Sequence, residues 1–198
     1  MRSMHGLVNR ALECFLRDTY SPALWAEVAH GARLGFGSFE PMLIYDLSQT
    51  EAVILSAASR LDRPREALLE DVGTYLVSHP TTERLRRLLR FGGVTFADFL
   101  HSLDDLPDRA RLALPELELP DLRLTATGPH RFRLVCASPI AGMGHVMLGL
   151  LRAMADDYGV LVLLEHRGQS AEGEVVSIAL LDAAFAAGRP FDLAERLG

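Results

Sequence analysis

The sequence predicts an α+β fold, with a helical part over about residues 1–106 and a smaller α+β part over about residues 107–181, in which a small antiparallel sheet packs on helices. Apolar residues of the first part recur every three to four positions, which is the helical period. Prolines become frequent from Pro107 onward, and short alternations of apolar and polar residues typical of strands follow. A broad helical apolar face returns at Met143.

The first helices follow from apolar spacing and from end signals. Apolar residues at helical spacing predict a helix over 7–16, and Ser21-Pro22 opens the next, since proline is tolerated in the first turn. Residues 48–51 (SQTE) form a capping-box pattern that predicts the start of a helix running to Leu61.

Three more helices complete the helical part. Pro64 opens a helix that runs to about Val77, and helices are expected over 82–89 and 94–106. Gly92-Gly93 separates the last two, because consecutive glycines favour a turn.

Four strands are expected in the second part. Residues 122–125 and 131–136 form a hairpin around the turn at 127–129, and 160–164 and 174–180 are rich in Val, Leu and Ile. The sheet is therefore expected to be antiparallel.

Composition excludes several classes of protein. The 198 residues suit one domain, and 49% apolar with 23% charged residues is typical of a globular protein. The net charge of −6 argues against nucleic acid as a partner. Two cysteines are too few for a disulfide framework, so we expect a cytoplasmic protein. No apolar stretch reaches the roughly 20 residues of a membrane span.

Standard catalytic and metal-binding motifs are missing. The sequence has no phosphate-binding loop, no dinucleotide-binding glycine pattern and no Gly-x-Ser-x-Gly string. Its seven histidines include no pair spaced i, i+4, which a helical metal site needs. The residues alone therefore indicate a globular α+β domain and no enzyme.

An ordered set of strings between Met4 and Leu181 carries a family resemblance. The strings are MHGLVNRALE (4–13), PALW (22–25), YDLSQT (45–50) and FLHSLDDL (99–106), followed by Pro115 and Pro120. Together they resemble the H-NOX family of haem-NO/oxygen-binding (HNOB) domains, which includes the N-terminal domain of the soluble guanylate cyclase beta subunit. The resemblance implies one H-NOX-like domain over 1–181, with a helical and an α+β part.

The resemblance also implies a site for haem b between the two parts, and here this sequence departs from the family. The family's iron-ligating histidine follows a Leu-Asp-x-Leu string, and that position is Pro107, which offers no donor atom. The family's Tyr-x-Ser-x-Arg motif, which holds the haem propionates, corresponds to Cys136, Ser138 and Ile140. Only the serine is kept, and Ile140 cannot form a charged hydrogen bond.

Three other side chains are candidate iron ligands. His101 lies six residues before Pro107, so a continuous helix turns its side chain about 120° away, and it needs an unwound helix end to reach the same point. His145 lies near the family's distal wall. A Cys136 thiolate is a third candidate, but it stands where contacts to the propionates are expected.

Without haem, the fold must fill a cavity with side chains or another ligand, because voids are costly. Val8 and Val146 cannot donate a hydrogen bond to bound oxygen, so a haem-bound form favours NO or CO. The candidate wall residues are Leu7, Val8, Phe15, Leu76, Leu103, Leu106, Met143, Val146 and Met147. The resemblance adds Pro120 as a candidate cofactor-binding residue.

Our leading hypothesis is a stand-alone, non-enzymatic H-NOX-like sensory or regulatory domain that has lost standard haem ligation. It signals through a partner, which the resemblance implies is a histidine kinase or a cyclic-dinucleotide enzyme. Two alternatives remain: a haem-based NO or CO sensor with His101 or His145 as ligand, and a module that binds another apolar small molecule. Residues 182–198 are expected to form a C-terminal tail, either a last strand or a docking segment.

Overall fold

The computed structural model describes residues 3–113 and 119–181. Pro115 and the expected tail at 182–198 lie outside the described residues. In chain order the elements are β1 (Ser3–His5), α1 (Gly6–Thr19), α2 (Pro22–Gly31), β2 (Ile44–Asp46), α3 (Leu47–Leu61), α4 (Arg65–Ser78), the 3₁₀ turn η1 (Pro80–Thr82), α5 (Glu83–Arg90), α6 (Phe96–His101), α7 (Leu106–Ala113), β3 (Asp121–Gly128), β4 (Arg131–Ala137), α8 (Met143–Tyr158), β5 (Val162–Gln169) and β6 (Glu174–Leu180).

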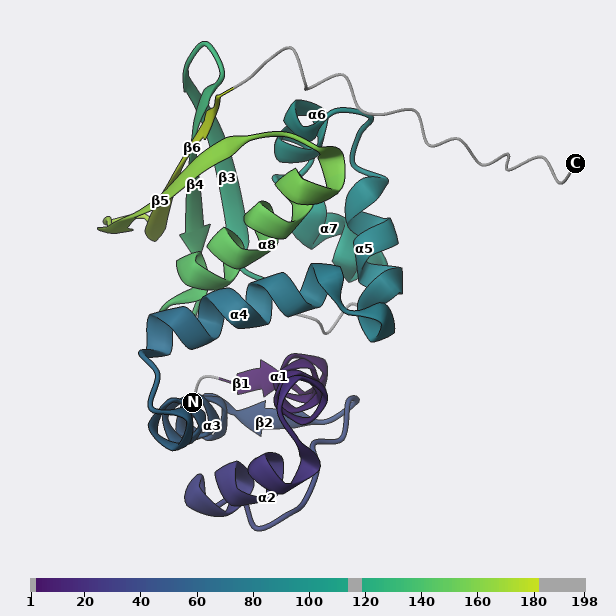
Figure 1. The fold of residues 1–198 in the computed structure, drawn as a ribbon, viewed down its shortest axis with the longest axis vertical. Coiled ribbons are helices and arrows are strands. Elements are labelled where there is room, and N and C mark those ends of the chain that lie inside the picture. The colour runs from purple at the N-terminus through teal and green to yellow at the C-terminus, as the bar shows by residue number, and fades with distance from the viewer. Residues whose placement is uncertain (1–2, 114–118, 182–198) are drawn as a thin grey trace, which may run out of the picture.

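Helix α4 lies at the centre of the arrangement (Figure 1). On one side of it are α1, α2, α3 and the short strands β1 and β2, and on the other side α8 runs along it. The sheet β3-β4-β6-β5 covers the far side of α8, and all its neighbouring strands pair antiparallel. The predicted α+β fold and antiparallel sheet are confirmed.

The strand predictions hold, with one shift. The hairpin of β3 and β4 pairs Leu122 with Cys136 and Leu124 with Leu134, as the alternation indicated. Strand β6 has the predicted bounds. Strand β5 begins two residues later than predicted and continues to Gln169, because its pairing with β6 extends to Glu174.

The start of α3 corrects the capping-box prediction at residues 48–51. The N-cap is Asp46, whose Oδ1 accepts a hydrogen bond from the Ser48 amide at 2.8 Å. Strand β2 ends at Asp46, so this carboxylate already lies at the first free amides of the helix. The pairing of β1 with β2 was not predicted, because each strand has only three residues. The predicted helix start at Ser21-Pro22 is confirmed: α2 begins at Pro22, and the Ser21 hydroxyl oxygen accepts a hydrogen bond from the Leu24 amide at 3.1 Å.

The single helix predicted over 94–106 is wrong. Helix α6 ends at His101, a turn follows, and α7 begins at Leu106, so that helix continues beyond Pro107 to Ala113. A tertiary contact accompanies the break: the Asp104 carboxylate in the turn accepts a hydrogen bond from the Leu124 amide of β3 at 2.6 Å. Pro107 is accommodated because the first turn of a helix does not need its amide hydrogen.

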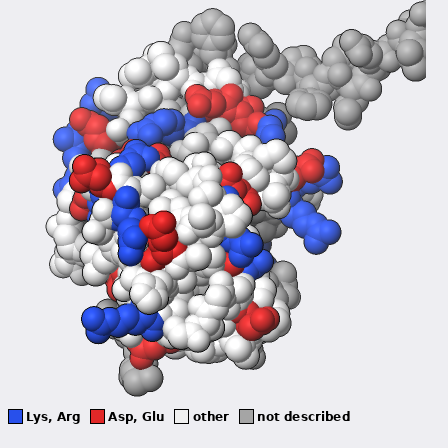
Figure 2. Space-filling model, turned by 60° about the horizontal axis from the view of Figure 1, so that its bottom comes forward, with Lys and Arg blue, Asp and Glu red and all other residues white. Residues whose placement is uncertain are grey.

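Two hydrophobic cores lie on opposite sides of the α4–α8 layer. The C-terminal core joins α6, α8 and the sheet, with Phe96, Leu134 and Leu151 buried. The N-terminal core joins α1–α4 and includes Trp25 and Leu68. Among the described residues, no helix is long and apolar enough to cross a bilayer. On the face in Figure 2, acidic and basic side chains are interspersed around a broad uncharged area.

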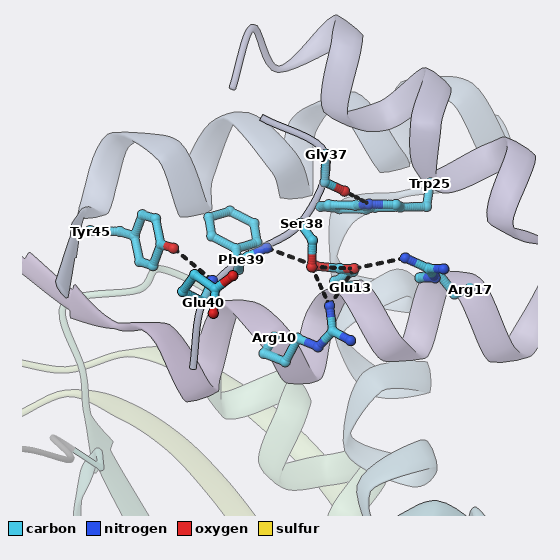
Figure 3. A network of polar contacts seen from close by, with 9 residues as sticks. All are labelled: Arg10, Glu13, Arg17, Trp25, Gly37, Ser38, Phe39, Glu40 and Tyr45. Atoms are coloured by element: carbon cyan, nitrogen blue, oxygen red, sulfur yellow. Dashed lines mark hydrogen bonds and ion pairs between the residues drawn. The ribbon is translucent and has the colours of Figure 1, made fainter. Parts of the chain in front are cut away.

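A buried carboxylate ties α1 to the loop before β2 (Figure 3). Glu13 is fully buried, and its Oε2 accepts a hydrogen bond from the Phe39 amide at 3.0 Å. Arg10 and Arg17 each place a guanidinium nitrogen on Oε1, at 2.6 and 3.0 Å, and the Ser38 hydroxyl lies 3.2 Å from both oxygens. These contacts satisfy a charge that would otherwise be costly to bury.

The same loop is held at two further points. Trp25 Nε1 donates to the Gly37 carbonyl at 2.8 Å, and the Glu40 amide donates to the Tyr45 hydroxyl at 2.7 Å (Figure 3). Together with the Glu13 contacts, these bonds hold residues 37–40 against α1, α2 and β2.

Replacing Glu13 with alanine is expected to lower the free energy of unfolding by about 3 kcal/mol, because the buried Phe39 amide loses its acceptor and two arginines lose their counter-ion. Urea unfolding followed by circular dichroism measures this. Glu83→Ala is the matched control, since Glu83 pairs with Arg87 on an exposed helix surface and its loss should cost less than about 0.5 kcal/mol. Equal effects of the two substitutions would contradict the role of Glu13.

Candidate functional site

An apolar cleft of about 300 Å³ lies between the N-terminal helices and the C-terminal part of the chain. Among the described residues that line it, only Thr50 and Ser138 have polar side chains. The lining residues are Met4, Leu7, Val8, Ala11, Leu12, Thr50, Ile54, Leu69, Val72, Leu76, Leu85, Leu88, Leu89, Leu106, Ala110, Leu119, Pro120, Leu122, Ser138, Pro139, Ile140, Met143, Val146, Met147 and Leu150.

Helical spacing brings these side chains to one place. On α4, Leu69, Val72 and Leu76 are spaced by three and four residues, so they share one face. Helix α8 presents Met143 and Val146 in the same way. The faces meet because α4 and α8 run along one another (Figure 1).

Most of the candidate residues do meet at the cleft. From the proposed haem site these are Val8, Leu106, Pro120, Ser138, Ile140 and Val146, and from the proposed wall Leu7, Leu76, Met143 and Met147. Phe15 and Leu103 do not line it. Phe15 packs edge-on against Tyr75 in the N-terminal core, and Leu103 is buried in the C-terminal core.

Pro107 and Cys136 are neighbours of lining residues in the sequence, but neither of them lines the cleft. Pro107 is buried on α7, between the lining residues Leu106 and Ala110. Cys136 is buried on β4 in the C-terminal core, and burial raises the pKa of its thiol to about 12. Forming the thiolate that coordinates iron is therefore costlier here than at an exposed cysteine.

Neither candidate histidine lines the cleft. His101 is exposed at the end of α6, where its ring packs in a T-shaped arrangement with that of Phe132, with the ring centroids 5.6 Å apart. His145 lies in a polar cluster: its ring stacks on that of His166 at 4.1 Å, and its Nδ1 is 3.3 Å from a Glu70 oxygen. The helix does end at His101, as its role as a substitute ligand required, yet its side chain stays at the surface.

The polar cluster fixes the start of α8, and sequence reasoning missed its centre, Glu174. This carboxylate accepts hydrogen bonds from the amides of Gly142 at 2.6 Å and Gly144 at 3.0 Å, and it lies 2.9 Å from His166 Nε2. A Cβ on Gly144 would lie 2.8 Å from a Glu174 carboxylate oxygen and 2.8 Å from His166 Nε2, so these groups would have to shift to admit a larger residue there. The closely spaced Gly142 and Gly144, one just before α8 and one in its first turn, were the available signal. The cluster positions Met143 and the residues after it on the cleft.

The two polar residues of the cleft differ in their hydrogen bonds. The Thr50 hydroxyl donates to Asn9 Oδ1 at 2.7 Å. The Ser138 hydroxyl oxygen accepts from the Ile140 amide at 3.1 Å, and its proton has no acceptor within the described ranges. Arg65 lies beside the following turn, where it donates to the Ala141 carbonyl, but Glu51 already pairs with its guanidinium through two contacts of 2.7 and 3.1 Å.

These residues do not fit haem held in the family's manner. Among the residues that the structure describes, the cleft lining has no imidazole and no thiolate for iron, and no cation for two propionates. The described lining offers an apolar surface and two hydroxyl groups, those of Thr50 and Ser138.

Solved structures with a similar fold are H-NOX proteins. The chain is similar to the Fe(II) unliganded H-NOX protein from K. algicida, with a TM-score of 0.76 and 17% identity, over 89% of this chain and 96% of that one. It is equally similar to the H-NOX protein from S. oneidensis in the Fe(II)NO state, with a TM-score of 0.76 and 17% identity, over 90% of this chain and 100% of that one.

Sequence comparisons agree. The chain is 22% identical over 154 residues to soluble guanylate cyclase gcy-31 of Caenorhabditis elegans, covering 78% of this chain and 22% of the cyclase. It is 20% identical over 183 residues to soluble guanylate cyclase 89Da of Drosophila melanogaster, covering 90% and 27%. The chain thus spans about a quarter of the length of these cyclases. A model of the haem-NO-binding family matches residues 5–166. The resemblance is thereby confirmed, and the chain belongs to the haem-NO-binding, or H-NOX, family.

Proposed function

We propose that this chain is a regulatory H-NOX domain that has lost histidyl haem ligation and acts through a partner protein. The observation that carries the proposal is the apolar cleft, whose described lining offers no iron ligand and no cation. H-NOX domains are sensor domains of a haem-based gas-sensing family, so the regulatory role is kept while the iron chemistry is given up.

Three further observations support the loss of ligation. Pro107 stands at the position that the resemblance assigns to the iron ligand, one helical turn before the lining residue Ala110. The Cys136 thiol has its pKa raised to about 12 by burial. His145 lies against Glu70 and His166 on the polar side of α8.

The proposal makes the domain non-enzymatic and places it in the cytoplasm. Both cysteines are free, which suits a reducing compartment. The partner, by resemblance, is a histidine kinase or a cyclic-dinucleotide enzyme. Its identity is sought by co-purification with the tagged domain.

Haem binding tests the proposal directly. The protein purified from haem-supplemented cells is expected to carry far less than one haem per chain, and hemin titration should give no Soret spectrum of a histidine-ligated iron. A stoichiometric Soret band would favour the haem-based NO or CO sensor. In that case His101→Ala and His145→Ala identify the ligand, because the spectrum changes only when the ligand is removed.

A gain of function sharpens this test. The double variant Pro107→His, Ile140→Arg restores an imidazole and a cation at the positions that the resemblance assigns to them, and is expected to bind hemin at least about tenfold more tightly than the parent. Pro107→Ala, Ile140→Leu is the matched control and should bind hemin like the parent. Equal binding by both double variants would contradict the proposed cause of the loss.

A further inference from the structure

We propose that the cleft is a binding site for a neutral, largely apolar small molecule that carries one hydrogen-bond acceptor, such as a medium-chain alcohol, aldehyde or ester. This inference rests on the proposed function, since the cleft must be free of haem. It names the chemical class that the lining selects.

The size and surface of the cleft suit such a molecule. Its volume of about 300 Å³ lies at the lower end of the roughly 300–1,000 Å³ found for small-molecule pockets. The α4 and α8 walls are aliphatic, and Met143 and Met147 are flexible side chains that adapt to irregular ligands. Leu88, which is 40% exposed, stands at the rim.

Charge selection follows from the lining. No described residue that lines the cleft is charged, so a carboxylate or phosphate placed there would lose its hydration without gaining a counter-ion. Arg65 does not change this, because its guanidinium already pairs with Glu51 through two contacts. The site therefore favours neutral molecules over anions of the same shape.

Ser138 supplies the polar anchor. Its hydroxyl oxygen accepts from the Ile140 amide, which leaves the hydroxyl proton to donate to a ligand oxygen. Thr50 is less suited, because its proton is donated to Asn9. One donor in an apolar cleft sets the orientation of the ligand, with its oxygen at the Ser138–Ile140 turn and its apolar body along α4 and α8.

A matched pair of fluorescent probes tests the class. 1-Anilinonaphthalene is neutral, and its 8-sulfonate has the same rings with one negative charge. The neutral probe should bind one per chain and at least about tenfold more tightly than the sulfonate, because burying the charge is unfavourable. Dodecan-1-ol should displace it at concentrations at least about tenfold lower than dodecanoate.

Variants locate the site. Val8→Trp fills the cleft from a half-buried position and should abolish binding of the neutral probe. Ile140→Arg adds a cation and should reverse the preference, so that dodecanoate displaces the probe better than dodecan-1-ol. Leu161→Arg is the control for added charge at an exposed leucine and should change neither result.

Ser138→Ala tests the anchor separately. It should weaken dodecan-1-ol by about fivefold, the value of one hydrogen bond, and leave the neutral probe unchanged. Circular dichroism melting of every variant shows that it is folded.

The outcomes separate the two proposals. Equal binding of both probes, or no binding of either to the folded parent, overturns the neutral-ligand site even when haem is absent. If the neutral probe still binds to a folded Val8→Trp variant, it binds outside the cleft, and this result also overturns the neutral-ligand site. A stoichiometric Soret band instead overturns the proposed function, and hemin then displaces the neutral probe.

Discussion

Replacing Gly149 with alanine is expected to lower the free energy of unfolding by about 3 kcal/mol or more. Gly149 lies on α8 against α4, and a Cβ there would lie 1.9 Å from the Glu70 carbonyl oxygen. The obstructing atom is backbone, so relief requires the two helices to separate, and that separation would loosen both hydrophobic cores. Urea unfolding followed by circular dichroism measures the loss.

Two further variants make this prediction specific. Gly73→Ala places a Cβ 1.9 Å from the Val146 carbonyl oxygen in the same helix contact, and should cost a similar amount. The double variant should cost less than the sum, because the first substitution already separates the helices. Gly37→Ala is the control, since a Cβ there meets nothing within 4 Å. A decrease in the free energy of unfolding of less than about 1 kcal/mol for Gly149→Ala would contradict the prediction, because it would mean that the two helices can separate at little cost.

Cys136 is expected to react with thiol reagents about a thousandfold more slowly in the folded protein than after unfolding. Burial raises the pKa of its thiol from the ordinary value of 9.0 to about 12. At pH 8 the reactive thiolate fraction is then about 10⁻⁴ in place of about 10⁻¹. The reaction of the Cys14→Ser variant with Ellman's reagent, with and without urea, measures this ratio. A ratio near one would contradict the burial of Cys136.

The same shift predicts a loss of stability at alkaline pH. The folded pKa of Cys136 lies above the unfolded value, so the folded state binds more protons between about pH 9 and pH 12. The stability contributed by the neutral thiol is therefore complete below about pH 9 and is lost as pH rises through that window. Cys136→Ala should flatten the dependence of the melting temperature on pH above 9. An unchanged slope would assign the alkaline loss to other groups, such as Tyr75, whose pKa burial also raises to about 12.

The fold was largely predictable because its elements carry strong periodic patterns. The helical faces of α1, α4 and α8 and the alternation of β4 gave correct elements, and seven of the nine proposed wall residues reached the cleft. The elements that were missed or misread are short ones. Strands β1 and β2 have three residues each, and the break between α6 and α7 coincides with a hydrogen bond from β3 to Asp104.

The candidate site was predictable in its apolar part and less so in its polar part. Residues such as Val146 and Leu76 lie on helix faces whose direction the sequence reveals. His145 was expected near the cleft, but the arrangement of Glu70, His166 and Glu174 places it in the polar cluster. Those partners come from three other elements, and no local pattern connects them.

The sequence by itself determined the family, the class of fold and the chemical character of the cleft, because these depend on local periodicity and on which side-chain types occur. The resemblance also assigns Pro107 to the position of the family's iron ligand and Ile140 to that of its propionate-binding cation. Only the tertiary structure decided which apolar residues enclose the cleft and where each histidine lies. The backbone contacts of Gly73 and Gly149 bring α4 and α8 together, and such contacts between distant segments have no signature within either segment.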